Sequence, residues 1–128
     1  MKVEEWVYSV LKNHAGVAAL TTAARIKPLG LWEGLVRPYI VHFPTNLRGT
    51  LVHRSRAGLT HWDFYQVSCF ADSYSGARAL ADQVRIALGE SYGEYQARWI
   101  GEGPSILDTE VQPPIHHIPV NFNITGQL

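Results

Sequence analysis

Apolar residues recur every three or four positions at the start of the chain, the spacing of one face of an α-helix. The set consists of Val3, Val7, Val10 and Leu11, with Trp6 beside Val10. Two acidic residues in the first turn suit the positive end of the helix dipole. We therefore expect a helix over residues 3–13, interrupted at Gly16, and a short helical turn over residues 17–20.

A long strand is expected over residues 61–71, followed directly by a helix. Both faces of this strand are largely apolar, which is unusual for a sheet with one side in water. The sheet should therefore be covered on both faces, by helices, by a neighbouring subunit, or by both. Asp72 or Ser73 can cap the helix that follows, which should end at Gly89. Its apolar stripe comprises Ala77, Leu80, Ala81, Val84 and Leu88.

Shorter apolar runs predict the remaining strands. They are a short strand ending at Pro28 and strands over 38–45, 95–101, 106–111 and 115–125. The order of helix, strands, helix and strands is typical of an α+β fold with a mixed or antiparallel sheet. We expect one domain over 1–128, packed by the N-terminal helix and the central helix at about 73–89. The structural core should include Val7, Leu11, Val67, Cys69, Leu80, Val84 and Leu88.

The composition of the chain limits the classes of function that we expect for it. Charged residues make up 17% of the 128 residues, below the usual quarter, and the 11 basic and 11 acidic residues cancel. A protein that wraps duplex nucleic acid usually carries a basic excess, so only a local patch could do that here. The low charge indicates that some surface is buried against a partner. A single cysteine, and no apolar run of membrane-spanning length, lead us to expect a cytoplasmic product without membrane contact.

The sequence offers little catalytic chemistry. His116 and His117 are adjacent, so on a strand they point to opposite faces and cannot chelate one metal ion together. Cys69 stands within a strand and lacks a neighbouring base or helix N-terminus, which favours a buried structural thiol. No nucleophile elbow, phosphate loop or dinucleotide fingerprint is present. We expect no enzymatic activity, no metal and no cofactor.

The best candidate contact segment is a basic loop or hairpin arm at about 46–60. It contains Arg48, His53, Arg54 and Arg56 between two glycines. Two readings stay open: a contact arm for a negatively charged partner, or a solvated hairpin tip. The aromatic residues Trp62 and Phe64 of the next strand also have two readings, as ordinary core or as part of a subunit interface.

Several of these segments, taken together, resemble a known family. They are "NHAGVAALTTAARIKPL", the proline-led strand "RPYIVHF", and "YQVSCFADSYSGARALADQVRIAL". In the last, Ala77, Leu80, Val84, Ala87 and Leu88 occupy the apolar positions of the family's central helix. The chain resembles, nearly end to end, the tail completion or tail terminator proteins of long-tailed bacteriophages and prophages. It departs from them in the longer basic segment and in "QPPIHHIPVNF", where a more acidic turn is usual.

The resemblance implies a structural role in the virion tail, in a protein made in the host cytoplasm. Such proteins form rings, often hexamers, at the head-proximal end of the tail tube. They stop tube polymerisation and present a docking surface to the head connector, while DNA passes through the lumen without sequence-specific binding. The expected partners are therefore further copies of the chain, the tail-tube protein and a connector or neck protein. Two alternatives remain: a neck or head-closure protein of the same joining region, and a small nucleic-acid-binding module that uses residues 48–56.

Overall fold

The computed structural model describes residues 3–28, 36–52, 59–91, 93, 95–110 and 113–127. Within the strands, residues 46–52, 59–63 and 127 are described by their backbone alone. The helical elements are α1 (Val3–Asn13), α2 (Ala15–Ala18), a 3-10 turn (Ala23–Arg25) and α3 (Tyr74–Gly89). The strands are β1 (Ile26–Pro28), β2 (Tyr39–Val52), β3 (Leu59–Ala71), β4 (Tyr95–Glu102), β5 (Ile106–Asp108) and β6 (Ile115–Gln127).

One mixed sheet organises the fold. Its strand order is β1-β2-β3-β6-β4, and β5 also pairs with β6. The β1–β2 pair is parallel, whereas all the other pairs are antiparallel. The short β1 and the β4–β5 segment thus form the two lateral edges of the sheet. This arrangement confirms the α+β class expected from the order of the elements.

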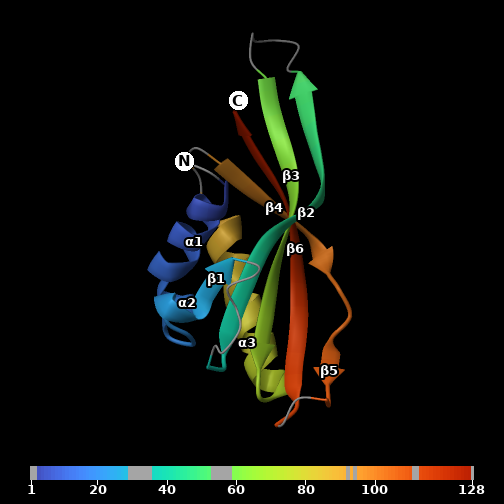
Figure 1. Ribbon diagram of the computed structural model, residues 1–128. Helices are drawn as coiled ribbons and strands as arrows, with labels where there is room; N and C mark the ends of the chain where they lie inside the picture. The colour runs from blue at the N-terminus through green and yellow to red at the C-terminus, as the bar shows by residue number, and fades with distance from the viewer. Residues whose placement is uncertain are drawn as a thin grey trace.

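The helices lie together on one face of the sheet (Figure 1). On this face α1 contacts β1 and β2, α3 contacts β3, β6 and β4, and the two helices touch each other. The core lies between the two layers, and alternate residues of β3 and β6 point into it. The residues that the sequence assigned to the core are all buried: Val7, Leu11, Val67, Cys69, Leu80, Val84 and Leu88.

The strand-to-helix junction is set by one serine. The Ser73 hydroxyl accepts a hydrogen bond from Gly76 N at 3.0 Å, which satisfies one of the free N–H groups in the first turn of α3. Of the two predicted caps, Ser73 therefore acts and Asp72 does not. Asp72 instead accepts a hydrogen bond from Arg37 Nη1 at 2.9 Å. Because β3 ends at Ala71, only two residues separate the strand from the helix that packs on it.

Several predicted boundaries were wrong, each for a local reason. The helical turn begins at Ala15 rather than at residue 17, because His14 Nδ1 accepts a hydrogen bond from Val17 N and caps it earlier. The strand predicted over 38–45 continues to Val52, because its pairing with β3 resumes after an irregularity between Pro44 and Arg48. The strand predicted over 106–111 ends at Asp108, whose carboxylate accepts a hydrogen bond from Glu110 N and starts a turn.

The second face of the sheet carries no helix among the described residues. A small cluster of Tyr39, Val41 and Ile115 is buried there, with Phe43 and Phe70 packed against it. All five belong to strands, so among the described residues this cluster is built from strand side chains alone. The described helices cover one face, and the expectation that the other face is covered, by a neighbouring subunit or by further helices, stays a prediction.

Candidate assembly surfaces

The basic segment begins within the β2–β3 hairpin. The backbones of the two strands pair from Arg48 opposite Asp63 as far as Val52 opposite Leu59. This part of the hairpin rises above the level of the helices (Figure 1). Arg48 and Trp62 thus stand on the paired arm, while His53, Arg54 and Arg56 lie outside the described residues. The topology places the predicted contact arm at one end of the sheet, away from the α3 junction.

Aromatic stacking organises the helix-free face. The Phe70 ring stacks on Tyr39 at 4.7 Å and on His117 at 4.3 Å between ring centroids. Phe64 is half-buried on the same side of β3 as Phe70. Burial lowers the pKa of His117 and raises that of Tyr39, so both groups are neutral near pH 7. The Phe70 ring therefore packs against side chains of the neighbouring strands β2 and β6.

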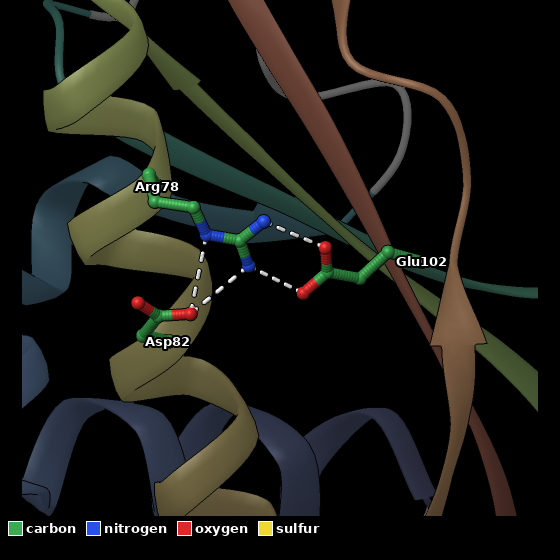
Figure 2. Close-up of polar contacts among 3 residues, drawn as sticks. All are labelled: Arg78, Asp82 and Glu102. Atoms are coloured by element: carbon green, nitrogen blue, oxygen red, sulfur yellow. Dashed lines mark hydrogen bonds and ion pairs between the residues drawn. The ribbon is translucent and has the colours of Figure 1, made fainter.

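A charged triad ties α3 to β4. Arg78 Nη1 donates a hydrogen bond to Glu102 Oε2 at 2.7 Å, and Nη2 donates to Glu102 Oε1. The same guanidinium reaches Asp82, one turn further along α3, at 2.9 Å (Figure 2). The hydrogen bonds from Arg78 hold the pKa of Glu102 below its usual range, and the same bonds raise the pKa of Arg78. Both carboxylates are thus occupied within the chain.

A bulge in β4 makes this triad possible. Trp99 stands opposite Phe122 and Gly101 opposite Asn121, so Ile100 is an extra residue relative to β6. The insertion switches the side-chain alternation and returns Glu102 to the helix side, opposite the buried Val120. Gly101 has a φ of 148°, a backbone conformation that side chains disfavour.

Exposed apolar side chains are concentrated on α3, β4 and β5, the elements along one edge of the sheet. Six of the eight exposed large apolar residues in the described part of the chain lie on these elements: Tyr74 at the start of α3, and Ile86, Trp99, Ile100, Ile106 and Leu107. The Arg85 guanidinium stacks over the Trp99 ring at 4.2 Å. We call this surface, with Arg85 included, the α3/β4 side. Sequence reasoning missed it, although adjacent Trp99 and Ile100 were a usable signal, because neighbours on a strand cannot both enter one core.

The opposite side of the molecule, formed by α1 and β1, contains a cleft of about 260 Å³. Its described lining comprises Glu4, Glu5, Tyr8, Ile26, Lys27, Pro28 and His42. His42 Nδ1 lies 2.7 Å from the Tyr65 hydroxyl, while its Nε2 has no hydrogen-bond partner in the described structure. Burial lowers the pKa of His42 to about 4, so the ring is neutral at pH 7. No pattern in the sequence predicted this cleft.

The described residues provide no arrangement suited to metal chemistry. His116 and His117 fall on opposite faces of β6, and no group of three or more potential metal ligands occurs in the described ranges. Cys69 is fully buried, and burial raises the pKa of its thiol. Among the described helices, none has the length and apolar character needed to cross a membrane.

Comparison with known proteins shows a shared fold. No protein-family model matches the sequence, and no curated protein does either. The structure is similar to a chain in the solved "Virion of native gene transfer agent (GTA) particle". The two superpose with a TM-score of 0.70 at 19% sequence identity, over 98% of this chain and 95% of the other. The chain therefore has, from end to end, the fold of a protein found in that virion.

Proposed function

We propose that this protein is a structural virion subunit that caps the head-proximal end of a phage-like tail tube. It assembles as a ring, of about six copies, stops tube polymerisation and presents the docking surface for the head connector. It acts by binding, with no catalytic step, cofactor or metal. DNA passes through the ring without sequence-specific contacts.

The end-to-end fold likeness to a chain of a gene transfer agent virion carries this proposal. The match covers 98% of this chain and 95% of the other, so the likeness extends over the whole described fold rather than one motif. The resemblance of the sequence to tail terminator proteins supports the finer assignment. The neutral net charge and the helix-free aromatic face are also typical of a subunit that associates with other proteins.

The experiment that tests this role measures tube length. Purified tail-tube protein of the same particle is polymerised with and without this protein, and tube lengths are measured by electron microscopy. We expect shorter tubes that carry a cap at one end. An unchanged length distribution with bare ends would contradict the role. The neck alternative predicts binding to isolated, connector-bearing heads and no effect on tube length.

A further inference from the structure

The α3/β4 side and the α1/β1 side are opposite lateral sides of the same two-layer domain. The first carries exposed apolar side chains beside the Arg85 cation, and the second carries a cleft with two carboxylates. We propose that the α3/β4 side of one copy packs against the α1/β1 cleft of a second copy, with Arg85 facing Glu4 and Glu5. This inference rests on the proposed ring, and it identifies the two surfaces that form each contact between copies.

The apolar side chains provide the first argument. Trp99 is 39% exposed and Ile86 41% exposed, although both are large side chains next to the edge strand. Burial of aromatic and aliphatic side chains at the centre of an interface is the main source of binding energy there. The cleft offers matching apolar lining from Tyr8, Ile26 and Pro28. A contact between the two sides removes exposed apolar surface on both.

Charge provides the second argument. Arg78 forms ion pairs with Asp82 and Glu102, whereas Arg85 forms no ion pair with a described residue. Arg85 stacks over the Trp99 ring, and its charge also acts on Glu102, whose pKa it helps to lower. Glu4 and Glu5 likewise make no ion pair with any described residue. Lys27 lines the same cleft, so the two glutamates and this lysine together give it one net negative charge. An arginine over an aromatic ring can bind a carboxylate while it keeps its stacking.

The short β1 edge and the position of Arg85 disfavour two simpler contacts between copies. β1 is only three residues long and ends at Pro28, which has no N–H to donate, so it cannot template a long added strand. A symmetric contact between the α3/β4 sides of two copies would bring their two Arg85 side chains together. These like charges would repel each other. Contact between different sides of successive copies avoids both problems. Such a contact repeats from copy to copy and closes into a ring when the rotation permits.

Charge reversal tests the contact in the full chain. Glu5→Arg and Arg85→Glu are made singly and mixed, and self-association is measured by light scattering, alone and with the tail-tube protein. We expect each single variant to lose association by on the order of tenfold or more. A mixture of the two should regain it, because alternating copies place opposite charges at every contact. Ala79→Glu, which adds a charge at an exposed position elsewhere on α3, should associate like the unaltered protein.

Disulfide trapping provides a second measurement. Cys69 is buried, so Glu5→Cys and Arg85→Cys introduce the reactive thiols. We expect cross-linking when the two single variants are mixed, and none from either alone. Two results would contradict the proposed contact without contradicting the ring. One is that the unaltered protein forms rings but charge reversal has no effect on association. The other is that Arg85→Cys cross-links to itself. If the unaltered protein never self-associates, with or without the tube, both the contact and the proposed function are wrong.

Discussion

Arg78 of α3 and Glu102 of β4 form a bidentate ion pair that fastens the central helix to the edge strand. The two residues are 24 positions apart, and the pair depends on the bulge that turns Glu102 toward the helix. Bidentate arginine–carboxylate pairs fix orientation as well as adding energy. Arg85, two turns further along α3, is thereby held over Trp99. The pair thus supports the surface that we propose for the contact between copies.

Glu102→Gln should lower stability near neutral pH by about 1 kcal/mol, because it replaces a partly exposed ion pair with neutral hydrogen bonding. The pKa of Glu102 is depressed in the folded protein, so the pair stabilises above the unfolded value and is lost as pH falls through the folded pKa. Urea melts at pH 7 and below pH 4 should show the difference shrinking in acid. Glu90→Gln, at an exposed glutamate just beyond the end of α3, is the control. An equal deficit at both pH values would contradict this account.

His42 should make the fold sensitive to mild acid. Its pKa is lowered to about 4 by burial, against about 6.5 in an unfolded chain. The neutral ring is therefore favoured in the folded state, and stability should fall by up to about 3 kcal/mol as pH drops from 6.5 to 4. His42→Leu should make the free energy of unfolding depend less steeply on pH in this range, whatever the substitution does to stability at neutral pH. Parallel stability curves for the two proteins across that range would show that other groups are responsible.

Leu80→Glu should unfold the domain. Leu80 is fully buried between α3 and the sheet, and an ionised carboxylate there costs several kcal/mol. Loss of the cooperative thermal transition is the expected result. Ala79→Glu places the same side chain at the preceding, exposed position of the helix and should melt normally. A cooperative melt of the Leu80 variant near the original temperature would show that the buried face of α3 is misassigned.

The combined change of Arg48, Arg54 and Arg56 to alanine should leave the fold intact and impair assembly. Arg48 lies on the paired arm, whereas Arg54 and Arg56 lie outside the described residues, and none of the three belongs to the described core cluster. A circular dichroism melt tests the fold, and the tube-length assay tests the function. Normal capping of tubes by the variant would show that the segment is a solvated hairpin with no role in assembly.

The sequence predicted most of the fold because its strongest signals are local. The stripe from Ala77 to Leu88 and the two-sided apolar β3 each follow from a spacing of a few residues. The β4 bulge could not be predicted in the same way, because it is defined by the register between Trp99 and Phe122, residues distant in sequence. The cleft at His42 has the same origin, since it joins α1, β1 and β2. Local patterns specify elements, whereas surfaces arise from how the elements meet.

The position of the protein in the assembled particle tests the central claim most directly. A full-length protein with a terminal tag is incorporated into particles, labelled with gold and imaged by electron microscopy. The proposed function predicts label at one place, the head-proximal end of the tail, and its retention on tails separated from heads. Label along the length of the tube, at the distal tip, or only on tail-free heads would contradict it.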